Sequence, residues 1–175
     1  TTLATNALIS RTGARTALVT TSGFRDTIEM RTESRFEQYD LNLVLPAPLI
    51  ERRDRHVLAE RISVDGRVLR PFDEAEARAL VAHLADRPDD EAYEAVAIGF
   101  IHAYVDGTHE RRFRDLLLER LPDVAVSISS EVSPQMREFE RFNTVCANAY
   151  VQPLMASYLR ELDEQLQARG ARCPV

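Results

Sequence analysis

Two histidines, His102 and His109, flank one expected strand-to-helix connection and are the side chains best placed for chemistry. His102 follows a long apolar run, and His109 falls in the first turn of the helix expected next. In open α/β sheets, ligands bind outside the carboxyl ends of strands, which is where this connection lies. Imidazoles beside Tyr104, Asp106 and Glu110 suit divalent-metal binding or general acid–base catalysis. The alternative is that His109 starts a surface helix and His102 makes a local hydrogen bond.

Two further groups of polar residues could serve a site. The first surrounds an expected helix start and consists of Glu131, Arg137, Glu138, Glu140 and Arg141. Arg137 and Arg141 share a helix face because they are four residues apart. One of them could face a substrate or partner domain. The alternative is that the whole group forms a solvated helix face stabilised by ion pairs. The second, Thr1, Thr2, Thr5 and Asn6, offers hydroxyls, an amide and helix N–H groups to an anion. The alternative for this second group is ordinary capping by Thr5 or Asn6.

The composition excludes several classes of protein. A net charge of −6 and a pI near 5.3 argue against a nucleic-acid surface, which needs clustered Lys and Arg. No apolar stretch approaches the roughly 20 residues that span a bilayer. Two cysteines do not make a disulfide framework, so we expect a cytoplasmic, reducing setting. The chain opens directly into a helix and a strand, and we therefore expect a fragment of a longer chain.

The elements that must position these residues follow from hydrophobic patterning. The first half predicts a short helix stopped by Gly13, a strand at residues 16–21, and a hairpin at residues 56–70 around an Asp-Gly turn. Asp73 should cap the helix after that hairpin, with Glu76 completing a capping box.

The second half predicts a buried central strand at residues 95–101, a helix at 108–121 and a strand at 124–129. The two strands should pair in parallel through a right-handed crossover. A helical segment at residues 133–169 should begin with Ser133 as N-cap, and Pro153 should kink or break it. The expected fold is one α/β domain over residues 1–175, with a mixed, largely parallel sheet, flanking helices, an edge hairpin and this long C-terminal helical segment.

Three separated motifs resemble the hydantoinase A / 5-oxoprolinase family, in order and over nearly the whole chain. They are T-T-x-A-T-N-A-L-I with A-R-T-A-L-V-T-T-x-G-F-R-D near the start, G-F-I-H-A-Y with H-E-R-R at residues 99–112, and S-S-E-V-S-P with R-E-F-E-R and N-A-Y-V at residues 129–151. The resemblance favours a functional role for Glu131 and Arg137 without assigning one. It also adds Asp40, in Y-D-L, as a residue that would join His102 and His109 around zinc or manganese.

The resemblance implies an actin-like ATPase-type enzyme that uses ATP and Mg²⁺ to hydrolyse cyclic amides such as hydantoin or 5-oxoproline. Family members usually begin with a phosphate loop that would lie upstream of Thr1, so we expect the fragment alone to bind no cofactor and to be inactive. Its partners would be a small cyclic-amide substrate, the rest of its own chain and a companion subunit in an oligomer, with no nucleic acid or membrane. The sequence assigns no catalytic residue.

Two alternatives stay open at this point. The chain could belong to a related ATP-dependent ketone carboxylase subunit, or it could be a non-catalytic assembly module. Gathering of Asp40, His102, His109 and residues 1–6 in one cleft would favour an enzyme. Scatter of these residues over the surface would favour an assembly module.

Overall fold

A four-stranded parallel sheet forms the centre of the computed structural model, which describes residues 2–32, 37 and 39–170. The strand order is β2-β1-β5-β6, and every pair is parallel. The strands are β1 (Thr16–Thr21), β2 (Arg55–Leu58), β5 (Ala95–Gly99) and β6 (Ala125–Ile128). The predicted strands at residues 16–21, 95–101 and 124–129 are thus confirmed, with the last two slightly shorter than expected.

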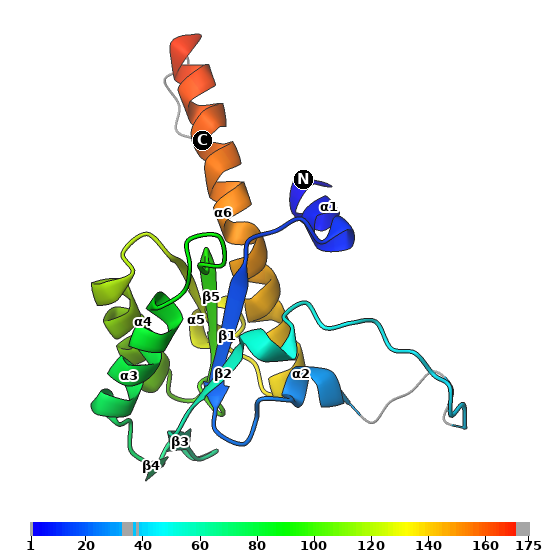
Figure 1. Cartoon of the computed structure of the whole chain (residues 1–175), viewed down its shortest axis with the longest axis vertical. Coiled ribbons are helices and arrows are strands. Elements are labelled where there is room, and N and C mark those ends of the chain that lie inside the picture. Colours follow the sequence, from blue (N-terminus) through cyan, green and yellow to red (C-terminus); the bar gives the residue numbers. More distant parts are fainter. Residues whose placement is uncertain (1, 33–36, 38, 171–175) are drawn as a thin grey trace.

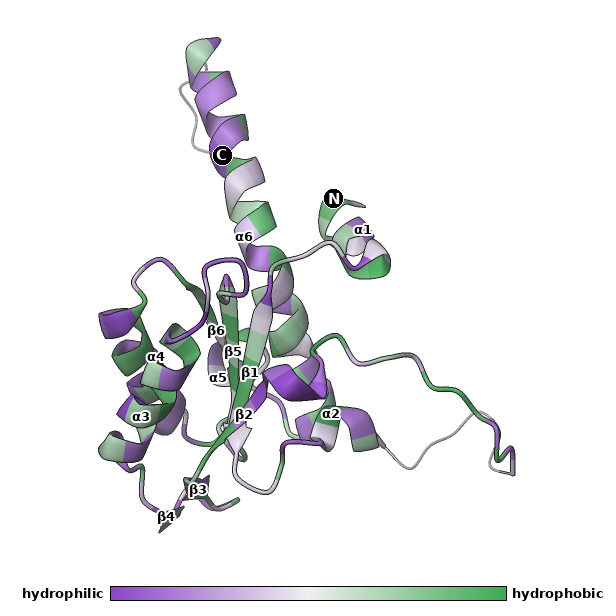
Figure 2. Cartoon of the chain, in the orientation of Figure 1, coloured by the Kyte–Doolittle hydropathy of each residue, from purple (hydrophilic) through white to green (hydrophobic). Residues whose placement is uncertain are grey.

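Helices cover both faces of this sheet (Figure 1). They are α1 (Thr2–Ser10), α2 (Thr27–Met30), α3 (Glu74–Ala85), α4 (Thr108–Arg120), α5 (Ser129–Val132) and α6 (Glu138–Ala168), with a 3-10 turn η1 (Arg52–Asp54). Figure 2 shows the apolar strands between these layers. Among the described residues, none of the helices combines the length and apolar character needed to cross a membrane.

Alternate residues of β1 feed two separate cores. Ala17 and Val19 join the core under α3 and α4, which includes Phe113. Leu18 points the other way, into the core with Phe142 on α6. Because successive strand side chains point to opposite faces, this continuous apolar strand requires cover on both sides.

The hairpin is shorter than the expected 56–70 span. Residues 55–58 form β2 and pair in parallel with β1, with Val19 opposite His56. Only β3 (Arg61–Ile62) and β4 (Val68–Arg70) form the antiparallel pair. Gly66 takes a φ of 81° in its turn, as the Asp-Gly signal predicts. The chain therefore leaves the main sheet immediately after β2.

The first helix also differs from its prediction. Thr5 and Asn6 lie inside α1 rather than at its cap, and the helix ends at Ser10, where Arg11 adopts a φ of 57°. Gly13 does not stop it. A Cβ at Gly13 would lie 2.6 Å from the carbonyl oxygen of Tyr150, so this glycine permits close approach to α6.

Two helix starts show where local signals held and where they failed. Asp73 caps α3 by accepting from the backbone N–H groups of Ala75 (2.8 Å) and Glu76 (3.1 Å). The capping box is not completed, because the Glu76 carboxylate accepts from the Ala59 N–H instead. Ser133 was wrongly predicted as an N-cap: it follows α5, and its N–H donates to the Ser129 carbonyl.

The long C-terminal helix starts later than expected and is not broken at Pro153. Arg137, with a φ of 81°, precedes α6, and the helix continues through Pro153 to Ala168. Its first half packs on β5 and β6, and its second half projects beyond the sheet (Figure 1). Packing of the first half on the sheet offsets the one hydrogen bond that a proline cannot make.

Candidate functional site

The carboxyl edge of the sheet gathers the chain's most buried polar residues. Helix α4 starts across this edge, and its first turn places two consecutive side chains, His109 and Glu110, into the interior. Consecutive helical residues point about 100° apart. The two side chains therefore enter different hydrogen-bond networks, described in turn below.

The first network joins Thr21, Glu60 and His109. The Thr21 hydroxyl, at the end of β1, donates to Glu60 Oε1, and the same Thr21 oxygen accepts from the Ile101 N–H at 2.9 Å. Glu60 follows β2 directly, and its Oε2 lies 2.7 Å from His109 Nδ1. The Phe72 ring packs against the imidazole with centroids 5.7 Å apart. The network thus links the ends of β1, β2 and β5 to α4.

The second network is centred on the Glu110 carboxylate, which is fully buried. It accepts from the Phe100 N–H (2.8 Å), the Ser129 hydroxyl (2.6 Å) and the Ser130 N–H (2.8 Å). Burial raises the pKa of Glu110, and the hydrogen bonds from Ser129, Phe100 and Ser130 oppose that rise. These contacts tie α4 to the ends of β5 and β6.

Arg141, on the first turn of α6, completes the second network. Its guanidinium donates to Ser129 Oγ (3.1 Å), the Phe100 carbonyl (2.8 Å) and the Gln135 carbonyl (3.1 Å). Ser129 in turn donates to Glu110, so a single hydroxyl bridges the buried cation and carboxylate. Burial lowers the pKa of Arg141, and the nearby charge of Glu110 counteracts this. The guanidinium also lies over the rings of Tyr104 and Phe142.

The three residues predicted to share a metal are not brought together. His102 follows β5 with a φ of 59°, and its Nδ1 lies 2.8 Å from the Ile62 carbonyl oxygen, whereas the Nδ1 of His109 contacts Glu60. Asp40 is exposed on the segment at residues 39–48, which extends away from the sheet, and it caps the Asn42 N–H (Figure 1). Within residues 2–32, 37 and 39–170, no three His, Cys, Asp or Glu residues are grouped to hold a metal ion.

The group of residues predicted to bind an anion, at positions 1–6, lies elsewhere on the molecule. Thr2, Thr5 and Asn6 belong to α1, which packs on α6 near the amino ends of the strands (Figure 1). Thr1 lies outside the described residues.

Glu131 and Arg137 are solvent-facing. Glu131 pairs with Arg114 at 2.9 Å, and Arg137 lies 3.9 Å from Glu140. The predicted site residues are therefore spread over several surfaces, the outcome that favours the assembly reading.

The sequence placed Glu110 beside the two histidines and Arg141 in the charged group at a helix start, but it did not identify Glu60 or Ser129 as site residues. One local signal was available for Arg141. It precedes Val145 and Ala149 at intervals of four, and all three are buried on one face of α6. An arginine on an apolar helical stripe predicts a buried cation that needs partners. Nothing local identifies Glu60, because its partners are 39 and 49 residues away.

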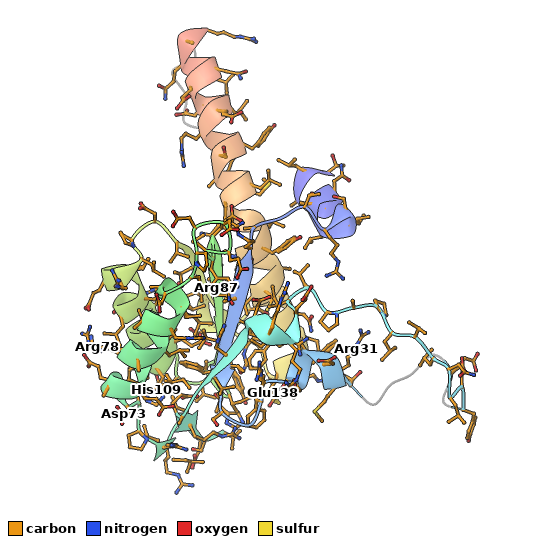
Figure 3. All side chains as sticks on the ribbon, in the orientation of Figure 1. Arg31, Asp73, Arg78, Arg87, His109 and Glu138 are labelled. Carbon is orange, nitrogen blue, oxygen red and sulfur yellow. The ribbon has the colours of Figure 1, made fainter. Side chains whose placement is uncertain are left out.

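A shallow open hollow of about 480 Å³ lies beside the first network. Phe72 lines it and also packs on His109; the other lining residues are Ala59, Arg70, Pro71, Asp73, Glu74 and Glu76. Asp73 and His109 lie at the same end of the α3–α4 layer in Figure 3. A ligand in this hollow would be separated from the imidazole by little more than one aromatic ring.

The amino edge of the sheet holds a second polar cluster. The Tyr93 hydroxyl donates to Asp54 (2.8 Å), accepts from Arg87 (2.8 Å) and lies 3.2 Å from His56 Nε2. Burial, followed by the charge of His83, lowers the pKa of His56 to about 4. Burial and Asp54 raise the pKa of Tyr93. This cluster borders an open hollow of about 210 Å³.

Comparison with known proteins gives a consistent result. Residues 1–121 match the family model described as the hydantoinase/oxoprolinase N-terminal region. An uncharacterised protein of Methanocaldococcus jannaschii is 36% identical over 97% of this chain and 25% of its own length. Caprolactamase subunit alpha of Pseudomonas jessenii is 34% identical over 99% of this chain and 25% of its length. Acetophenone carboxylase gamma subunit of Aromatoleum aromaticum is 31% identical over 97% of this chain and 24% of its own length.

A solved structure agrees with these sequence matches. The ATP-dependent caprolactamase from Pseudomonas jessenii superposes with a TM-score of 0.88 at 34% identity, over 99% of this chain and 25% of that one. The chain therefore spans about a quarter of the length of the relatives it matches.

Proposed function

Because this chain belongs to the hydantoinase/oxoprolinase N-terminal region family, we propose that it forms part of an ATP-dependent enzyme that hydrolyses cyclic amides. The observation that carries the proposal is the match to an ATP-dependent caprolactamase along 99% of the chain, at a TM-score of 0.88. An unactivated amide is a poor electrophile with a poor leaving group. Phosphorylation of its oxygen by ATP makes that oxygen a good leaving group. This activation explains why hydrolysis of such an amide would require ATP.

Within such an enzyme, this chain contributes the carboxyl edge and not the nucleotide site. The donors of Arg141 are used by protein acceptors, and the described residues contain no cluster of metal ligands for the Mg²⁺ that accompanies ATP. Arg141 is thus not available to a phosphate of the nucleotide, and the family resemblance puts the phosphate loop for the nucleotide and its metal ion outside this chain. We assign both to the rest of the longer protein, together with the phosphate loop.

A companion subunit is part of the proposal. Two of the relatives are named as subunits, alpha of a caprolactamase and gamma of an acetophenone carboxylase. The segment at residues 39–48 carries exposed apolar side chains, Leu41 and Val44 among them, which is consistent with a contact outside this chain.

Two alternatives have specific support. Similarity to the acetophenone carboxylase gamma subunit favours an ATP-dependent ketone carboxylase. The separation of Asp40 and α1 from the carboxyl edge, where His102 and His109 lie, favours a non-catalytic assembly module. The buried networks at the carboxyl edge favour the enzyme, since they fix side chains where parallel sheets bind ligands.

Substrate-dependent ADP formation by the full-length protein with its companion subunit separates these possibilities. Caprolactam, hydantoin and 5-oxoproline should stimulate ADP release and yield the ring-opened acid, identified by mass spectrometry. Stimulation by acetophenone only in the presence of bicarbonate would establish the carboxylase instead. The 175-residue chain alone should release no heat in calorimetric titration with Mg-ATP, and a micromolar dissociation constant would contradict our placement of the nucleotide.

A further inference from the structure

The projecting half of α6 carries a continuous apolar stripe. Successive helical residues point about 100° apart, so side chains three and four positions apart fall on one face. Over residues 151–168, apolar side chains follow this spacing within about 100° of the helix circumference. These stripe residues are Val151, Met155, Tyr158, Leu159, Leu162 and Leu166. At 1.5 Å per residue the stripe is about 22 Å long.

The rest of the described chain leaves this stripe open to solvent. Every buried residue of α6 lies between Arg141 and Tyr150, whereas Tyr158 and Leu159 are 43% and 47% exposed. In Figure 1 this half of the helix extends past both α1 and the sheet. An amphipathic helix normally packs its apolar stripe on another element, and a helical segment of this length gains little stability in water without such packing.

Acidic side chains border the stripe on both sides. Asp163 on one flank and Glu161 on the other lie about 90° to 110° from its centre. Their carboxylates accept from Gln167 and Ser157, which belong to α6 itself. A second copy of the chain would set carboxylate against carboxylate in either helix orientation, because both flanks are acidic. The charges therefore favour an occupant that has Lys or Arg beside its own apolar face.

The lengths of the relatives indicate where this occupant lies. The match to the caprolactamase covers 99% of this chain, and so includes the projecting half of α6, but only 25% of that chain. The Methanocaldococcus jannaschii relative is likewise matched over 25% of its length. Most of each polypeptide thus lies outside the match. A segment of the same polypeptide meets α6 at a high effective concentration and without association of separate molecules.

We propose that the α6 stripe is the docking surface for a helix of the same longer polypeptide, with an apolar stripe bordered by Lys or Arg. A helix is the occupant because the spacing of three and four residues forms ridges that fit the grooves of another helix. The proposal needs only the family membership and is independent of the amide chemistry.

Photo-crosslinking in the full-length protein tests the proposal. Tyr158→p-benzoylphenylalanine places a photoreactive ring within the stripe, and Glu164→p-benzoylphenylalanine is the matched control on the opposite face of the same helix. Irradiation of the Tyr158 variant should link α6 to a peptide of the same polypeptide outside residues 1–175. The product should keep the mass of one chain, with the linked peptide identified by mass spectrometry. The control should form little of this link.

The other outcomes overturn the proposal in different ways. A product of twice the chain mass would assign the stripe to a second copy. A product with the summed mass of the chain and its companion subunit would assign it to that subunit. Equal yields at the two positions, or no link at either, would show that the stripe is not a specific docking surface.

Hydrogen exchange of the unsubstituted full-length protein gives a readout that needs no variant. Without the companion subunit, the amides of residues 152–168 should exchange about as slowly as those of residues 141–150, because both halves of α6 are then packed. Fast exchange of residues 152–168 alone would overturn the proposal. Protection that appears only when the companion subunit is added would overturn it in favour of that subunit.

Discussion

The two edges of the same parallel sheet carry similar charged side chains, but these are buried at the carboxyl edge and partly exposed to solvent at the amino edge. At the carboxyl edge, Glu60, Glu110 and Arg141 have at most 1% of their surface exposed. At the amino edge, the side chains of Asp54 and Arg87 are 18% and 26% exposed and border an open hollow. A charged side chain in contact with water can change its partner at little cost in free energy. A buried charged side chain needs fixed hydrogen-bond or ion-pair partners to offset its loss of hydration. The comparison separates an edge that can hold a fixed geometry from one that responds to pH.

The largest expected effect tests the buried edge. Arg141→Met should lower the free energy of unfolding by about 3–5 kcal/mol, because it leaves Glu110 without its cation and the Gln135 carbonyl without a donor, while the Phe100 carbonyl keeps only the Ala103 N–H. Urea denaturation measures the change. Arg137→Met is the matched control on the same helix start, and its solvent-exposed side chain should cost no more than about 0.5 kcal/mol. Equal costs for the two variants would remove the distinction between buried and exposed arginines.

Glu110→Gln should have the next largest effect. The amide nitrogen keeps the shape of the carboxylate but presents a donor to the Ser130 N–H or to the Phe100 N–H. One buried N–H then loses its acceptor, at a cost of about 1–3 kcal/mol. Chemical denaturation of Glu110→Gln beside the surface variant Glu131→Gln gives the comparison. A stabilised Glu110→Gln would mean that burial of the carboxylate outweighs its three hydrogen bonds.

The amino edge should instead show a pH-dependent stability. The pKa of His56 is lowered to about 4 in the folded chain, from 6.5 for a free side chain. The unfolded state thus binds more protons between pH 6.5 and 4, so stability falls as pH falls through this window. Because His56 is only partly buried, we expect a loss of about 1–2 kcal/mol rather than the full value of the shift. Denaturation of wild type and His56→Gln at pH 7 and pH 4.5 isolates this term, and identical losses in the two would exclude His56 as its source.

The smallest expected effect concerns the Tyr93 hydroxyl. Tyr93→Phe removes the hydrogen bonds to Asp54 and from Arg87, but water reaches both partners. The cost should be about 1 kcal/mol or less in thermal or urea melts. A loss as large as that of Arg141→Met would show that the amino edge is as rigid as the carboxyl edge.

The sequence predicted most of the fold where a local pattern was strong. Apolar runs identified β1, β5 and β6, and Asp73 marked the start of α3. Strand β2 was predicted to be part of a hairpin because the Asp-Gly turn at residues 65–66 follows an alternating run that begins at His56. Arg55 is nevertheless buried, since it pairs with Glu29 at 2.7 Å and donates to the Ile50 carbonyl. Those partners lie in segments that no local pattern connects to it.

The site was harder to predict than the fold for the same reason. The position of His109 at the carboxyl edge followed from the strand–helix pattern alone. Its partner Glu60 depends on the pairing of β2 with β1, which was not foreseen. The contact between Arg141 and the Phe100 carbonyl spans 41 residues. The strand–helix pattern in the sequence locates the carboxyl edge of the sheet. Which side chains meet at that edge depends on the strand pairing, which no local pattern shows.

The adjacency of His109 and Glu110 restricts how this chain can vary in length. One residue inserted in α4 between Glu110 and Phe113 would rotate His109 and Glu110 by about 100° relative to the buried side chains of Phe113 and Leu117, and it would withdraw both from their networks. A residue inserted in the extended segment at 39–48 disturbs no such arrangement. Family members should therefore tolerate no insertion within the first two turns of α4, while they can differ in length in the segment at residues 39–48.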